Sequence, residues 1–327
     1  MILISHNFSL MPLPATIPAA IRPAVIGVAC LVLATSACAS SPAADEEDAA
    51  LTVAAAFYPL EYVAERVGGD LVSVSSLTPP GVEPHDVELS PAAVRDMGNA
   101  DLVLFIKAFQ PAVEDAIEAT GVSAFDATDV IDLAETEHDD AEEPHADGDE
   151  DDGHGHGSED PHFWLDPAIL ADYASAVGEE FAALDAANAD AYRANAATLA
   201  AELEELDETF STGLARCERR DIVTSHSAFG YLAHAYDLHQ VGIAGIEPDT
   251  EPSPARLREI GQLIRDTGAT TVFTEQLVSA RVAEAVAQDT GVTTAVLDPL
   301  ETAANGDDYR SVMLRNLDAL REALDCG

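Results

Sequence analysis

Residues 187–214 read ANADAYRANAATLAAELEELDETFSTGL, and this stretch predicts one long helix. Its large apolar side chains recur at spacings of three and four, after an initial gap of seven, which places them on one helix face. At 1.5 Å per residue the helix is about 40 Å long, roughly the width of a domain. A helix of this length between two folded units is a stiff connector. The apolar stripe consists of Tyr192, Leu199, Leu203, Leu206, Phe210 and Leu214.

Strands alternate with helices on the N-terminal side of this connector. Strands are expected at Leu51–Phe57, Leu71–Leu77 and Asp101–Ile106, and a helical pattern follows each of them. A further helix is expected at Pro167–Leu184. Such alternation is typical of a parallel α/β unit. The first lobe is therefore predicted to span 51–185.

The same alternation resumes after the connector, which is assigned to 186–215. A second lobe is predicted at 216–327, so the fold class is α/β, with two lobes that each contain a mainly parallel sheet. One long, rigid backbone helix joins them. The strands expected in the second lobe are Asp221–Thr224, Gln240–Ile243, Thr270–Thr274 and Thr293–Leu297.

Side chains that bind metals occur where several of these strands end. Ligands of open α/β sheets bind beyond the carboxyl ends of the strands. A single histidine or carboxylate at such a place is usually structural, but here a whole set obeys one positional rule. The set combines residues of both lobes and predicts a metal in the cleft between them. Its members are His85, His162, His226, Glu275 and Asp298.

A second group of histidines lies in an acidic segment at 135–160, which reads ETEHDDAEEPHADGDEDDGHGHGSED. The segment has no apolar residue larger than alanine, so it cannot form a core and is predicted to be a disordered loop. Dense imidazoles and carboxylates attract divalent transition metals. We interpret the loop as an accessory metal-capturing segment; a solvated insertion with incidental histidines is the alternative. Its histidines are His138, His145, His154 and His156.

The formal net charge of the chain is −45. A field of this sign disfavours binding to nucleic acid or to anionic membrane surfaces, and it attracts cations.

The N-terminus has the pattern of a targeting segment. Arg22 precedes an apolar stretch, and small residues then lead to Cys38. This resembles a bacterial lipoprotein signal, which predicts a signal peptide at 1–37, a lipid on Cys38 and a flexible linker at 38–50. The protein would then be anchored to the outer face of the cell membrane. The alternative is an ordinary secretion signal, which would give a periplasmic or secreted protein.

The exported part contains two cysteines, Cys217 and Cys326. Two cysteines in an oxidising compartment indicate one disulfide, and two unpaired thiols are the alternative.

Several motifs together resemble a known family. The segments PPGVEPHDVELSP (79–91), DPHFWLDP (160–167), VTSHSAFGYLAHAYDL (223–238), GIEPDTEPSPARL (245–257), VFTEQ (272–276) and VLDPL (296–300) resemble the zinc/manganese substrate-binding proteins of bacterial ABC importers. The resemblance extends over about residues 51–327.

This resemblance implies a zinc-binding, non-enzymatic, extracytoplasmic protein that delivers its ion to an ABC importer permease. The implied ligands are His85, His162, His226 and Asp298, with Glu275 as a supporting acid. Three imidazoles and a carboxylate suit Zn²⁺, whereas Mn²⁺ prefers more oxygen. The protein is expected to be a monomer.

Three other functions are compatible with the same residues. They are a manganese-binding importer component, an extracytoplasmic metal buffer that uses mainly the histidine-rich loop, and a secreted zinc hydrolase. No His-Glu-x-x-His motif supports the hydrolase.

Overall fold

The first lobe contains a parallel sheet in the order β2-β1-β3-β4. The computed structural model describes residues 50–135, 159–302 and 308–327. Alternation of strands and helices produces the sheet, because parallel neighbours need a crossover between them. Its elements are β1 (Leu51–Ala55), α1 (Tyr58–Gly68), β2 (Val72–Ser76), α2 (Pro91–Met97), β3 (Leu102–Phe105), α3 (Pro111–Thr120) and β4 (Ala124–Asp126).

The second lobe repeats this design with a parallel sheet in the order β10-β9-β7-β8. The predicted α/β fold with two parallel-sheet lobes is confirmed. The elements are β7 (Asp221–Thr224), α6 (Gly230–Ala235), β8 (His239–Gly242), α7 (Pro254–Thr267), β9 (Thr271–Thr274), α8 (Arg281–Thr290), β10 (Thr293–Val296) and α9 (Tyr309–Leu324).

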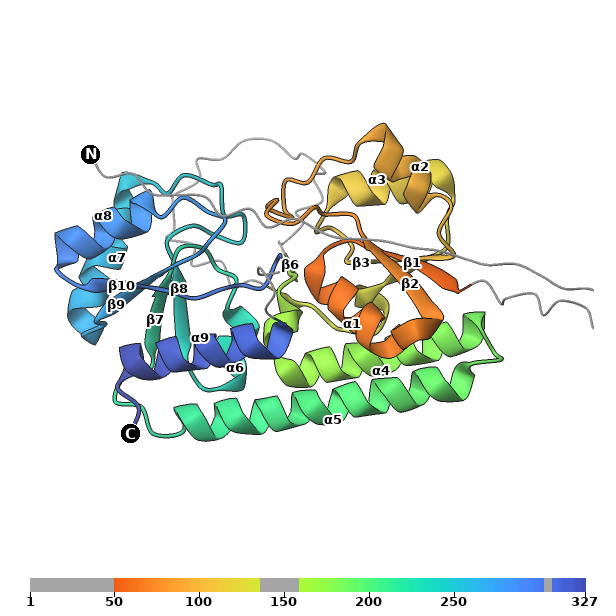
Figure 1. Cartoon of the computed structure of the whole chain (residues 1–327). Coiled ribbons are helices and arrows are strands. Elements are labelled where there is room, and N and C mark those ends of the chain that lie inside the picture. The colour runs from red at the N-terminus through yellow and green to blue at the C-terminus, as the bar shows by residue number, and fades with distance from the viewer. Residues whose placement is uncertain (1–49, 136–158, 303–307) are drawn as a thin grey trace, which may run out of the picture. The chain divides into compact units, whose positions relative to one another are not determined.

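Two long helices connect the lobes, α4 (Pro167–Leu184) and α5 (Ala189–Leu214). Figure 1 shows them side by side, with α4 beneath the first lobe and α5 extending beneath both lobes. All six residues of the predicted apolar stripe of α5 are buried. The helix contacts α1 of the first lobe and α9 of the second, so it supports both. The exact lobe boundaries stay predictions.

The main core is continuous between the lobes. A single cluster of buried side chains includes Phe57 of the first lobe, Phe210 of α5 and Phe273 of the second lobe. A smaller cluster, with Val223, Ile264 and Val272, lies within the second lobe. The two lobes are therefore joined by one hydrophobic core that includes α5.

Two structural details were not predicted or only partly predicted. The strand β4 is three residues long at the edge of its sheet and has no large apolar run to indicate it. The ends of the acidic segment pair as a two-stranded antiparallel ladder, with Glu135 opposite Glu159. The rest of that segment, including its four histidines, lies outside the described residues, as do the predicted signal peptide and Cys38.

A disulfide joins Cys217, just after α5, to Cys326, just after α9. The predicted pairing is therefore present. Among the described residues, no helix has both the length and the apolar character that crossing a membrane requires.

Candidate metal centre

His85 lies on the loop between β2 and α2, and a buried polar network holds this loop. The Gln110 amide donates a 3.0 Å hydrogen bond to the carbonyl oxygen of Pro84 and another to the Thr78 hydroxyl. The Thr78 hydroxyl in turn donates to the carbonyl of Ala56 at 2.7 Å. The imidazole of His85 packs edge-on against Phe109, with ring centroids 4.7 Å apart. The chain thus fixes a buried histidine on an irregular loop.

His162 follows β6 (Glu159–Asp160) and begins the short 3-10 helix Phe163–Leu165. One carboxylate oxygen of Asp160 lies 3.0 Å from the backbone nitrogen of His162 and 2.7 Å from its Nδ1 atom. An Nδ1–H···carboxylate bond leaves Nε2 as the lone-pair atom of the neutral ring, which is the state that binds metals.

His226 follows β7 and has a similar partner in Glu275, which follows β9. The Nδ1 atom of His226 lies 2.7 Å from Oε2 of Glu275. The other oxygen of Glu275 accepts from the Ser225 hydroxyl and from the backbone N–H of His226. Both side chains are buried. Glu275 thus lies on the outer side of the imidazole, as expected for a supporting acid.

The carboxylate that faces the three histidines belongs to Glu301, not to the predicted Asp298. One Oδ atom of Asp298 accepts a 2.8 Å hydrogen bond from the backbone N–H of Leu300, and the other accepts from Gln276. Leu300 adopts a left-handed φ of 60°. Asp298 therefore shapes the turn after β10, and that turn brings Glu301 to the histidines.

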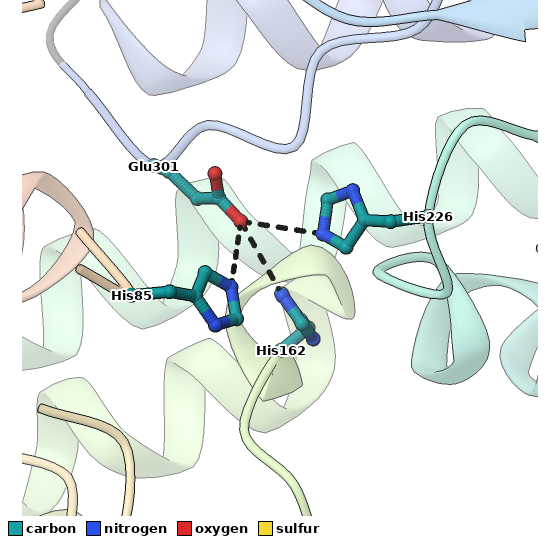
Figure 2. Close-up of side chains that lie close together, drawn as sticks. All are labelled: His85, His162, His226 and Glu301. Carbon is teal, nitrogen blue, oxygen red and sulfur yellow. Dashed lines mark ion pairs between the residues drawn. The ribbon is translucent and has the colours of Figure 1, made fainter. Parts of the chain in front are cut away.

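Figure 2 shows the four side chains converging. The Nε2 atoms of His85, His162 and His226 lie 3.5, 3.4 and 3.6 Å from Oε1 of Glu301. All four ligand atoms lie within 4.8 Å of one another. Zinc bonds of about 2.1 Å in a tetrahedron give ligand–ligand edges of about 3.4 Å. The three observed distances from Glu301 match such an edge, and the other pairs lie within 4.8 Å, so the four groups are close enough to bind one ion.

The ligand atoms are buried and lack other partners. Glu301 is 2% exposed, and His162 and His226 are fully buried. The three Nε2 atoms and Oε1 of Glu301 make no hydrogen bond to the described residues. Unpaired buried polar atoms cost free energy, so four that face one another indicate a bound ion.

The carboxylates change the acidity of the cluster. Burial opposes a charge on His85, but Glu247 and Glu301 outweigh it and raise its pKa to about 9. Burial also opposes a charge on His226, whose pKa is nevertheless raised to about 10 by Glu275 and Glu301. Burial would raise the pKa of Glu301, yet the surrounding histidines hold it well below its usual range. The ion-free centre thus holds protons that a divalent cation would displace.

Sequence reasoning missed Glu301 because it selected the first acid after β10. The available signal was a second acid three residues beyond Asp298, across the sequence Pro299-Leu300. The left-handed turn that joins them is not evident from the sequence.

Comparison with known families places this centre in context. Residues 53–323 match the family model described as zinc-uptake complex component A, periplasmic. The high-affinity zinc uptake system protein ZnuA of Bacillus subtilis is 31% identical over 309 residues, covering 91% of this chain and 96% of its own. The zinc-binding lipoprotein AdcA of Streptococcus pneumoniae R6 is 31% identical, covering 86% of this chain. The chain spans only 57% of the length of that AdcA protein.

Solved structures agree with these relatives. Zn(II)-bound AdcA from Streptococcus pneumoniae superposes with a TM-score of 0.70 at 30% identity, covering 85% of this chain and 58% of that one. The laminin-binding protein Lmb of Streptococcus agalactiae, described as having adhesin and metal transporting activity, gives 0.74 at 29% identity, with coverage of 84% and 99%. The matched family is a component of an uptake complex and not an enzyme family. This chain therefore belongs to the family of periplasmic zinc-uptake complex component A.

Proposed function

We propose that this protein captures Zn²⁺ outside the cytoplasm and delivers it to the membrane permease of an ABC importer. The observation that carries the proposal is the buried convergence of three imidazole nitrogens and one carboxylate oxygen between the lobes. Membership of the zinc-uptake family supports it. The names of ZnuA and zinc-binding AdcA point to the same ion.

The proposed ligands are His85, His162, His226 and Glu301. Three nitrogens and one oxygen suit tetrahedral zinc, whereas manganese prefers more oxygen ligands and a higher coordination number. Zinc is therefore favoured over manganese as the transported ion. Asp298 and Glu275 support the site from outside: Asp298 shapes the turn before Glu301, and Glu275 pairs with His226.

The proposed location follows from the N-terminal pattern. We propose that residues 1–37 are removed, that Cys38 carries a lipid, and that residues 38–50 tether the body to the outer face of the membrane. The body acts as a monomer that docks on the permease. Mass spectrometry of the exported protein tests the anchor, since a lipidated Cys38 must be its first residue.

The histidine-rich segment is proposed to be an accessory that attracts zinc with low affinity. Deleting 138–156 tests this while leaving the Ala134–Asp160 pairing intact. Zinc importer function predicts that one tight site survives the deletion. If only weak sites exist and the deletion removes them, the protein is a metal buffer.

The most informative experiment for the function is metal analysis of the exported protein purified from its own host. We expect one zinc per chain in the wild type and loss of that zinc in His226→Ala. Manganese as the main bound metal would contradict the proposal.

A further inference from the structure

Each histidine of the centre has a carboxylate on its outer nitrogen, but the three carboxylates differ. Asp160 is two residues from His162, and Glu275 belongs to the same lobe as His226. Both are buried, with side chains 8% and 2% exposed. In each of these two pairs, the Nδ1 atom and a carboxylate oxygen lie 2.7 Å apart, and both side chains are buried.

The third pair crosses between the lobes. The Nδ1 atom of His85, in the first lobe, lies 3.5 Å from Oε2 of Glu247, in the second lobe, which is an ion-pair distance and not a hydrogen bond. The imidazole side chain is 1% exposed, whereas the Glu247 side chain is 65% exposed. Among the described residues, Glu247 is the only carboxylate that forms an ion pair with the Nδ1 atom of His85, and its side chain lies at the surface.

Glu247 lies on the loop between β8 and α7, and the base of this loop is attached to the turn that holds His226. The backbone N–H of Ser227 donates to the carbonyl of Gly245 at 2.9 Å, and that of Ala244 donates to Ser225 at 2.9 Å. The loop therefore extends from the turn beside one histidine to the outer nitrogen of another.

A carboxylate on the outer nitrogen of a metal-binding histidine fixes the tautomer and the orientation of the ring. For His162 and His226 this support is fixed by burial. For His85 it exists only while the Glu247 loop lies against the first lobe. His85 is thus the ligand whose support can be lost without disturbing the core.

We propose that Glu247 is a positioning residue that holds His85 for zinc across the lobes, and that this contact sets the rate of zinc release. The inference rests on the proposed zinc-binding function, and it identifies the contact between His85 and Glu247 as the point at which zinc release begins. Loss of the contact frees the His85 ring to rotate, which leaves the ion with His162, His226 and Glu301.

The test is zinc release from the loaded protein into excess chelator, followed by stopped-flow mixing. We expect Glu247→Ala to release zinc about 10-fold faster or more, within the range typical of lost outer-shell partners. The release rate of Glu247→Gln should lie between those of the wild type and Glu247→Ala, because glutamine keeps an oxygen near Nδ1 but loses the charge of the ion pair. The matched control is Glu251→Ala, which removes the same charge from an exposed residue of the same loop, and it should change the rate less than twofold.

A second readout separates positioning from a general structural effect. In zinc-loaded protein labelled with ¹⁵N-histidine, Glu247→Ala should speed solvent exchange of the Nδ1 proton of His85 only. The Nδ1 protons of His162 and His226 are internal controls. Equal release rates for Glu247→Ala and Glu251→Ala, or an unchanged His85 signal, would overturn the proposal. Absence of a tight site in the wild type would instead overturn the zinc-binding function itself.

Discussion

The indole N–H of Trp164 donates a 2.7 Å hydrogen bond to the carbonyl oxygen of Pro299. Trp164 follows His162 in the first-lobe connection, and Pro299 precedes Glu301 in the second lobe. The Trp164 carbonyl also accepts from the Tyr309 hydroxyl at 2.7 Å. One buried side chain thus joins the turns that present two proposed ligands.

Replacing this indole should weaken both the fold and the site. Trp164→Phe removes the donor and leaves the buried Pro299 carbonyl unpaired, which costs about 1–3 kcal/mol. We expect the variant to unfold at lower urea concentration and to bind zinc less tightly. Unchanged zinc affinity would mean that the Glu301 turn holds its position without Trp164.

The same residue should report zinc binding. Trp164 is the only tryptophan of the chain, and its ring lies 5.0 Å from the imidazole of His162. Zinc would bind the Nε2 atom of His162 beside the indole. The intrinsic fluorescence should therefore change and saturate at one equivalent of zinc. A signal that rises only over several equivalents would indicate the accessory segment instead.

Glu301 and Asp298 should respond differently to substitution. Glu301→Gln removes the charged ligand, and zinc affinity should fall by more than about 100-fold, beyond the usual effect of outer-shell changes. Asp298→Asn keeps an oxygen for the Leu300 N–H, so its effect should be much smaller. Competition titration with a zinc chelator measures both. The reverse order would restore Asp298 as the ligand.

Zinc binding should release protons at neutral pH. His85 and His226 have pKa values raised to about 9 and about 10, so both imidazoles are in the positively charged, doubly protonated form at pH 7.5 without zinc. Because these raised pKa values favour the protonated, ion-free state, zinc affinity should increase with pH until about 10 and decrease as pH falls. Calorimetry in buffers of different ionisation enthalpy should detect about one to two protons released per zinc. A release of none would contradict the assigned ligands.

The disulfide should matter for stability rather than for the site. Replacing Cys217 and Cys326 together with serine removes a link across 109 residues and should cost roughly 2–4 kcal/mol. Zinc affinity at 25 °C should not change, because the link joins the ends of α5 and α9. Urea unfolding and chelator competition measure the two effects separately.

The sequence predicted those features that depend on periodicity and strand order. The apolar stripe from Tyr192 to Leu214 predicted α5, and the rule that ligands gather at strand ends selected three histidines that the structure brings together. Each of these inferences needs only local patterns and one topological rule.

Features that depend on turn geometry or contacts across the lobes could not be predicted. Asp298 and Glu301 are both acids near the same strand end, and only the left-handed backbone at Leu300 decides which one faces the histidines. Glu247 lies in a loop without a periodic pattern, and its contact with His85 exists only once the lobes have packed.

The most direct test of the central claim is the position of zinc in crystals of the loaded protein, located by anomalous scattering at the zinc absorption edge. Our account predicts one strong peak at about 2.1 Å from the Nε2 atoms of His85, His162 and His226 and from a Glu301 oxygen. A peak bound by Asp298, or the absence of a peak between the lobes, would contradict it.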